Sequence, residues 1–149
     1  MTDRPISAAL PAESVTIAVD RFTEPFWEAA RAGSLVAAQC AQCEKFRMPP
    51  TPFCPGCGSM EIHWAELSGT ATVFSFTVVT HHPAVGPILM IPAVLDLDGA
   101  PGVRLVSPIV GVDPADVHIG MAVTVEFVPI AGGWQLPVFT SLGERTIPS

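Results

Sequence analysis

Two CxxC pairs contain all four cysteines of this 149-residue chain: Cys40 with Cys43, and Cys54 with Cys57, ten residues further on. A CxxC pair on a tight turn directs two sulfurs at one point, and a second pair completes a tetrahedron around a single ion. Zn²⁺ takes four thiolates in this geometry in structural sites. The spacing therefore predicts a zinc ribbon, in which two short hairpins each carry one pair.

Two alternatives concern the same four residues. A rubredoxin-type site holds iron with four thiolates, so iron remains open as the metal. Two disulfides would need an oxidising compartment, and the opening Met-Thr-Asp-Arg-Pro starts no apolar signal segment. We therefore expect reduced thiols and a cytoplasmic protein. Because all four positions would be filled by protein, the metal would contribute to folding and would not activate water.

Other residues able to do chemistry are few. His81 and His82 form the one histidine cluster, but adjacent residues of a strand point to opposite faces and do not chelate one metal together. No cysteine is left free to act as a nucleophile, and no serine lies in a nucleophile elbow. The sequence predicts no catalytic site.

The charge of the chain narrows the class of partner. The net charge is −7, and beyond Arg47 there are two basic against eight acidic residues, so nucleic-acid binding is not expected.

The chain is also poor in charged residues and apolar on average. Charged residues make up 14%, against about 25% in typical proteins, and mean hydropathy is +0.46. No run approaches the ~20 apolar residues of a membrane span. Such a surface predicts a protein partner; a large β core is the alternative.

Four segments are expected along the chain. Residues 1–20 show no periodicity and predict a flexible, poorly ordered arm. Residues 21–36 predict a helix over 23–33, with Thr23 as N-cap, Pro25 in the first turn and Gly33 at the end, followed by a lead-in strand. Residues 37–62 form the ribbon, and residues 63–149 the last domain.

The last domain has a β pattern. Five strands are expected, at 70–80, 88–97, 103–110, 121–128 and 135–141, with a helical turn at 113–116 before the fourth and a hairpin turn at Gly132-Gly133. This order predicts a small closed Greek-key barrel, the OB-fold. The expected fold class is mostly β: an N-terminal helix, a rubredoxin-like zinc ribbon and a C-terminal five-stranded OB-fold barrel.

Three stretches resemble a known family: the helix Phe26–Leu35, the ribbon Cys40–Ser59, and Leu67–Thr77 with the later Gly111–Pro114. The chain resembles the zinc-ribbon domain-containing OB-fold proteins of the thiolase-associated type. The resemblance implies a non-catalytic accessory subunit that binds and stabilises a thiolase-fold acyl-CoA enzyme and helps to shape its acyl-CoA passage. That enzyme would be a thiolase or a retro-aldolase, for example in steroid or aromatic side-chain degradation, in an assembly of two plus two chains.

The opposing hypothesis is a stand-alone acyl-CoA or lipid-carrier module whose barrel holds the acyl group. Under the accessory-subunit hypothesis, three aromatic residues on or beside the short helix are expected to bind the partner: Phe22, Phe26 and Trp27. The cations available for a CoA phosphate are Arg31, Lys45, Arg47 and Arg104. For Lys45 and Arg47, balancing the anionic metal centre or contributing to the surface field is the alternative.

Overall fold

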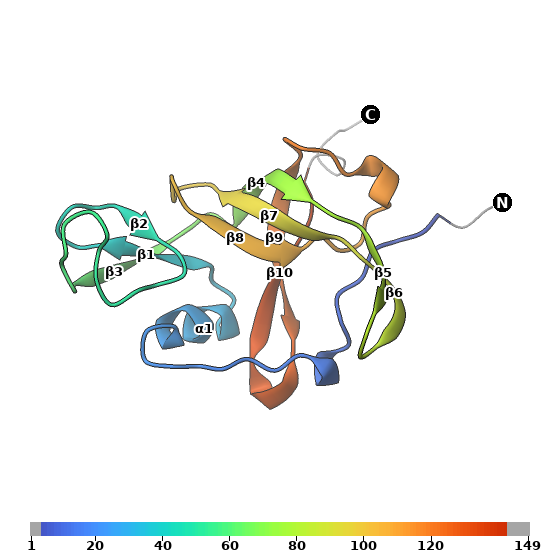
Figure 1. Cartoon of the computed structure of the whole chain (residues 1–149), viewed down its shortest axis with the longest axis horizontal. Helices are drawn as coiled ribbons and strands as arrows, with labels where there is room; N and C mark the ends of the chain where they lie inside the picture. The colour runs from blue at the N-terminus through green and yellow to red at the C-terminus, as the bar shows by residue number, and fades with distance from the viewer. Residues whose placement is uncertain (1–3, 143–149) are drawn as a thin grey trace.

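The computed structural model of the chain describes residues 4–142 and has two parts (Figure 1). Strands β1–β3 form a ribbon at one end, and a curled sheet forms a barrel at the other. Helix α1 lies beneath the junction of the two parts. Within the described residues, no helix is long and apolar enough to cross a membrane.

Helix α1 spans Glu24–Arg31. Pro25 lies in its first turn, and Gly33 ends it with a φ of 86°, a conformation that glycine adopts without strain. The side chain of Thr23 makes no capping bond to the helix, contrary to expectation. Instead, the Asp20 carboxylate accepts the amides of Phe22 and Thr23, both at 2.9 Å, and orients the chain that enters the helix.

The ribbon is a three-stranded antiparallel sheet in the order β2-β1-β3. Its strands are β1 (Val36–Cys40), β2 (Phe46–Arg47) and β3 (Ile62–Glu66). The amide of Leu67 donates to the carbonyl of Leu35 at 2.8 Å, which continues this pairing to the start of the barrel.

The barrel is an antiparallel sheet of five strands in the order β10-β9-β4-β7-β8. Its strands are β4 (Thr70–Phe76), β7 (Pro92–Leu97), β8 (Arg104–Pro108), β9 (Ala122–Pro129) and β10 (Gln135–Ser141). The sheet curls until Ile109 forms a parallel bridge to Phe139, and the Val110 amide donates to the Phe139 carbonyl at 2.7 Å. The five-stranded OB-fold predicted from the sequence is confirmed.

Two of the five expected strands are each divided. The end of the segment expected at 70–80 and the start of the one expected at 88–97 leave the barrel and form a separate hairpin, β5 (Val79–His82) with β6 (Gly86–Met90), which projects from the barrel in Figure 1. Apolar and β-branched residues continue from β4 into β5 and from β6 into β7. The local sequence therefore could not indicate where the strands change sheets.

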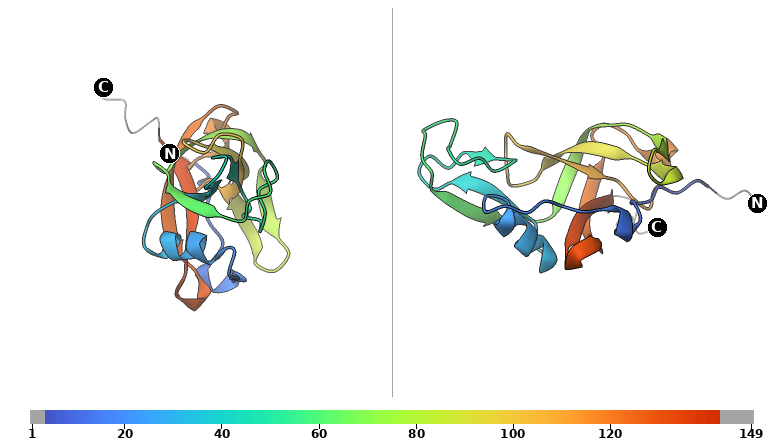
Figure 2. Two further views of the ribbon diagram at one scale, coloured as in Figure 1. Left: turned by 90° about the vertical axis from the view of Figure 1, so that its left-hand side faces the viewer. Right: turned by 60° about the horizontal axis from the view of Figure 1, so that its bottom comes forward.

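The N-terminal arm, for which the sequence predicts flexibility, makes hydrogen bonds to the rest of the chain at several of the described residues 4–20. Ser7 is buried: its amide donates to Val112 at 2.8 Å, its hydroxyl donates to Ile109 at 2.8 Å, and its carbonyl accepts the amide of Gly111 at 2.9 Å. Figure 2 shows the arm running along the barrel to the 3-10 turn η1 (Ala12–Ser14) and on to α1. Such main-chain pairing with a segment about 100 residues away leaves no periodic signal in the sequence. Residues 1–3 lie outside the described residues.

The interior of the barrel is filled by side chains. The largest fully buried ones are Phe139, Ile91, Leu95, Ile109, Val73, Val123 and Val138. The same core continues into the helix and the lead-in strand through Phe26, Leu35 and Val36. An acyl chain inside this barrel would have to displace well-packed residues, which disfavours the carrier hypothesis.

Candidate metal centre and partner surface

The two knuckles of the ribbon orient the sulfurs through backbone amides. Strand β1 ends at Cys40, whose sulfur accepts the amides of Gln42 at 3.4 Å and Cys43 at 3.5 Å. In the second knuckle the sulfur of Cys54 accepts the amide of Gly56 at 3.3 Å. Each tight turn thus directs backbone N–H groups at a sulfur, and these hydrogen bonds stabilise its ionised form.

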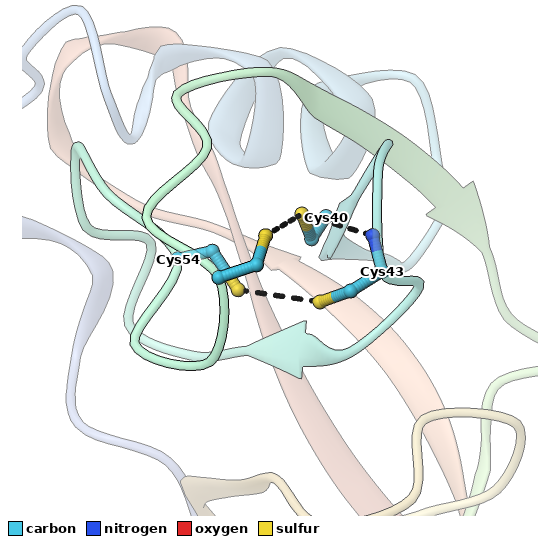
Figure 3. A group of neighbouring side chains, drawn as sticks. Cys40, Cys43 and Cys54 are labelled. Atoms are coloured by element: carbon cyan, nitrogen blue, oxygen red, sulfur yellow. Dashed lines mark hydrogen bonds between the residues drawn. The ribbon is translucent and has the colours of Figure 1, made fainter.

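The four sulfurs lie within 4.8 Å of one another. Sγ of Cys40 is 3.6 Å from Sγ of Cys57, and Sγ of Cys43 is 3.5 Å from Sγ of Cys54. Figure 3 shows the side chains of Cys40, Cys43 and Cys54 turned toward one point. A tetrahedron of sulfurs around Zn²⁺, each about 2.3 Å from the ion, has edges of ~3.8 Å, so the donor set fits one such ion. The four residues form no disulfide.

The acidities of the thiols support the same fit. The amide of Cys43 is the main cause that lowers the pKa of Cys40 to about 6, and the amide of Cys57 is the main cause that lowers the pKa of Cys54. The amide of Ser59 lowers the pKa of Cys57, but the neighbouring sulfurs, Cys40 first, outweigh it and raise that pKa to about 11. The protein's own amides therefore favour some thiolates, and a cation is needed before all four can be ionised.

The three aromatic residues expected at a partner surface differ in how deeply the structure buries them. Phe26 is only 6% exposed and belongs to the core, so little of its side chain is accessible in the free chain, and its contact with a partner stays a prediction. Trp27 is half-buried, with its ring edge-on to Phe26 at 5.1 Å between centroids. Phe22 is half-buried under the guanidinium of Arg21, at 4.8 Å. Phe26 and Trp27 differ in burial because they lie on different faces of the helix. Phe26 and Ala30 lie on the face that packs inward.

The arginines expected to contact CoA do not converge. The guanidinium of Arg31 lies 3.9 Å from the centre of the Trp134 ring. That of Arg104 lies 3.7 Å from the centre of the Phe74 ring, and its Nε donates to Asp96 at 2.8 Å. Arg47 is 4% exposed, so little of its side chain is accessible in the free chain, and its contact with CoA stays a prediction. Its Nε donates to the carbonyl of Thr51 at 3.0 Å, while its two terminal nitrogens have no hydrogen-bond partner among the described residues.

A groove at the junction of the ribbon and the barrel was not predicted from the sequence. It has a volume of about 320 Å³ and is mostly apolar, and its lining residues come from the helix, the loop after β2 and strand β8: Thr23, Phe26, Trp27, Met48, Pro49, Pro50, Arg104, Leu105 and Val106. Two side chains next to each other on its β8 side, Arg104 and Val106, are exposed. These segments are far apart in the chain, so no local pattern could have joined them.

Fold and site together define a protein with a zinc ribbon followed by an OB-fold. Sequence models of two ChsH2 domains match the chain: the rubredoxin-like zinc ribbon domain over residues 27–62 and the C-terminal OB-fold domain over residues 64–128. The chain therefore belongs to the ChsH2 family, also called DUF35, which confirms the resemblance found in the sequence.

Three curated relatives are similar in sequence. A probable enoyl-CoA hydratase alpha subunit of Thermomonospora curvata is 38% identical over 123 residues, covering 82% of this chain and 38% of the relative. A 3-oxo-4,17-pregnadiene-20-carboxyl-CoA hydratase alpha subunit of Mycobacterium tuberculosis is 36% identical over 117 residues, covering 78% and 36%. A DUF35 domain-containing scaffold protein of Methanocaldococcus jannaschii is 31% identical over 98 residues, covering 62% and 67%. The chain spans little more than a third of the two hydratase subunits.

Two solved structures are similar in three dimensions. One chain of the structure described as "Ltp2-ChsH2(DUF35) aldolase" has a TM-score of 0.76 and 34% identity, and the match covers 85% of this chain and 98% of that one. A DUF35 protein of unknown function from Sulfolobus solfataricus has a TM-score of 0.58 at 15% identity, with coverage of 83% and 87%, and shows the fold alone.

Proposed function

We propose that this chain is a non-catalytic accessory subunit that binds and stabilises a thiolase-fold acyl-CoA enzyme, foremost a retro-aldolase that shortens steroid or aromatic side chains. The observation that carries the proposal is the similarity to a chain of the Ltp2-ChsH2(DUF35) aldolase, 34% identical over 98% of that chain. The catalytic groups would belong to the partner, and this chain would help to shape the acyl-CoA passage.

The chemistry of the described residues supports this division of labour. The four thiols are gathered at the ribbon, where a metal would occupy them. His82 accepts the amide of Ala84 through Nδ1 in an exposed hairpin, with no carboxylate or nucleophile bonded to it among the described residues. A catalytic base needs a nucleophile or substrate atom within hydrogen-bond reach. We therefore expect no turnover from the isolated chain.

The metal in this proposal is a structural Zn²⁺, held by Cys40, Cys43, Cys54 and Cys57. The match to a zinc ribbon domain and the arrangement of the sulfurs support it. The bound ion would tie the two knuckles together and hold residues 37–62 folded.

Co-expression with a thiolase-fold enzyme of the Ltp2 kind tests the accessory role. We expect both chains to co-elute in a complex whose mass by light scattering fits two plus two, and we expect retro-aldol cleavage by the complex but not by this chain alone. Failure to co-elute, together with full activity of the enzyme alone, would refute the proposal. Turnover by the rigorously purified chain would show that a catalytic site was missed.

A second candidate is association with an enoyl-CoA hydratase. Two relatives are named hydratase alpha subunits, and in each the part similar to this chain occupies little more than a third of the length. The same elution experiment with a hydratase decides between the partners. The carrier hypothesis makes the opposite prediction: a monomer that binds acyl-CoA by itself, measurable by calorimetry.

A further inference from the structure

Strand β8 lies at one end of the barrel sheet and pairs with β7 along one side only, before Ile109 turns toward β10. In an antiparallel pair, the residues whose backbone groups bond the neighbouring strand alternate with residues whose groups point away. The amide of Ile109 donates to Ile91 at 2.9 Å, so the odd-numbered residues of this strand face β7. The backbone groups of Arg104 and Val106 therefore point out of the sheet.

A second bond fixes the same alternation independently. The amide of Val110, an even-numbered residue, donates to the Phe139 carbonyl at 2.7 Å, on the side away from β7. Main-chain pairing with β10 thus begins beyond Pro108; before it, Ser107 reaches β10 through its side chain, whose Oγ donates to the Pro137 carbonyl at 2.8 Å. The backbone edge at Arg104 and Val106 is left open in the described part of the chain. Val106 is 71% exposed. Open strand edges are usually protected, because they pair with any available strand.

This open edge forms one side of the groove described above. Across from it lie Trp27 and the loop Met48–Pro50, which present apolar side chains and two prolines. A groove with a free strand edge on one side and apolar side chains on the other suits an extended peptide, whose backbone pairs with the edge and whose alternate side chains enter the groove. Pro108, which has no N–H, limits the pairing to a short segment.

The lining of the groove indicates the kind of segment that fits. The residues that line it include one cation, Arg104, and no acidic residue. The charge of Arg104 is already paired, because its Nε donates to Asp96 at 2.8 Å. Most of the other lining residues are apolar, so the groove suits a segment that is mainly apolar.

We propose that the open edge of β8 is a β-augmentation site, which binds a short extended segment of the partner enzyme that is mainly apolar. The inference rests on the proposed accessory function and adds the surface and the mode of binding. The occupant pairs with the backbone of Arg104 and Val106, and its apolar side chains contact Trp27 and Met48.

The variant Val106→Pro tests the backbone contact. Proline removes the N–H that points out of the sheet but no hydrogen bond to β7, so β8 should remain in place. Val106→Thr is the matched control, because it keeps the N–H and nearly the same shape. With the Ltp2-type enzyme as probe, we expect Val106→Pro to bind about tenfold or more weakly and Val106→Thr to bind as the wild type does. Metal content and thermal unfolding of both variants establish that they are folded.

Amide hydrogen exchange of the wild type tests the site without any substitution. We expect the amides of Arg104 and Val106 to exchange fast in the free chain and slowly in the complex, with that of Leu105 slow in both. If the complex forms while these two amides still exchange fast, or if folded Val106→Pro binds as the wild type does, the augmentation site is refuted and the accessory role stands. If the wild type forms no complex, the accessory role fails, and this inference fails with it.

Discussion

The chemistry of this chain is concentrated in single residues of the ribbon. The sulfurs of Cys40 and Cys54 each accept backbone amides, and all four sulfurs lie within 4.8 Å of one another. Arg47, in the same ribbon, is the described residue whose buried side-chain nitrogens lack partners. These residues form a metal-binding arrangement of sulfurs, and the Arg47 Nε holds the following loop by donating to the Thr51 carbonyl.

Replacing one sulfur should release the metal. We expect Cys54→Ser to lose its metal, which is about one equivalent in the wild type, and to become poorly soluble, because three thiolates cannot close the site. Ser59→Ala, which changes a hydroxyl beside the second knuckle, should keep the metal. Elemental analysis of both proteins measures this and distinguishes zinc from iron. Well-folded wild-type protein that contains neither metal would contradict the prediction.

The elements are connected by turns whose backbone conformation leaves little choice of residue. Gly69, before β4, has a φ of 92°, and a Cβ placed there would lie 2.7 Å from Cγ1 of Val125. Gly102, before β8, has a φ of 87° and nothing within 4 Å of such a Cβ. The two positions share the same backbone strain and differ in the space available.

Comparison of two alanine variants separates strain from crowding. Gly102→Ala should lower the free energy of unfolding by about 1 kcal/mol, the cost of a left-handed conformation for a non-glycine residue. Gly69→Ala should cost a further ~1–3 kcal/mol because Val125 must move. Denaturant unfolding with unchanged slope measures both values. If both variants lose the same free energy of unfolding, Val125 on β9 moves aside without cost, and crowding at Gly69 is refuted.

The N-terminal arm is attached through ion pairs that respond to pH. Arg4 donates to Asp113 and to Asp116, each at 2.8 Å. The pKa of Asp113 lies below its usual 3.8, mainly because its carboxylate accepts the amide of Ala115 and secondly because it accepts a hydrogen bond from Arg4. A carboxyl whose pKa is lowered on folding stabilises the fold fully above its ordinary pKa, and this contribution is lost as the pH falls through the folded value.

The arm should therefore loosen in acid, below pH 3.8. We expect the amides of Ser7 and Ala8, which donate to Val112 and Leu89, to lose protection against hydrogen exchange in that range. Arg4→Ala should produce the same loss at neutral pH. Arg21→Ala, which removes an arginine that stacks on Phe22, is the control. Unchanged protection in Arg4→Ala would mean that the backbone bonds of Ser7 alone hold the arm.

At the scale of the whole molecule, the helix, the ribbon and the barrel meet at the groove. Trp27 lines it from the helix and also packs against the core. Aromatic residues that are partly exposed at the centre of a pocket commonly carry the energy of an interface. A partner that docks here would contact all three parts of the fold at once.

We expect Trp27→Ala to weaken the complex with the partner enzyme by about 2 kcal/mol or more, with unchanged metal content. Phe53→Ala, at an exposed aromatic of the ribbon outside the groove, should bind as the wild type does. Light scattering of mixtures measures the association, and thermal unfolding checks that both variants are folded. If Trp27→Ala binds equally well, the partner docks elsewhere on this chain.

The sequence by itself determined the features that depend on near neighbours. The two CxxC pairs predict the knuckles because a turn of four residues depends on local sequence alone. Strand β10 begins and ends at the predicted residues, Gln135–Ser141. Asp113 caps the turn Pro114–Asp116 by accepting the amide of Ala115, as the local motif indicates. The five strands of the barrel and the fold class followed from such short-range patterns.

Only the tertiary structure decided the features that depend on distant segments. Phe26 and Trp27 are adjacent and both aromatic, yet packing buries Phe26 and leaves Trp27 half-buried. Arg47 is charged but buried, and the arm pairs with residues about 100 positions away. The open edge at Val106 exists because β10 joins the sheet only beyond Pro108. Burial and pairing are set by which surfaces meet when the chain folds, and near neighbours in sequence carry little information about that.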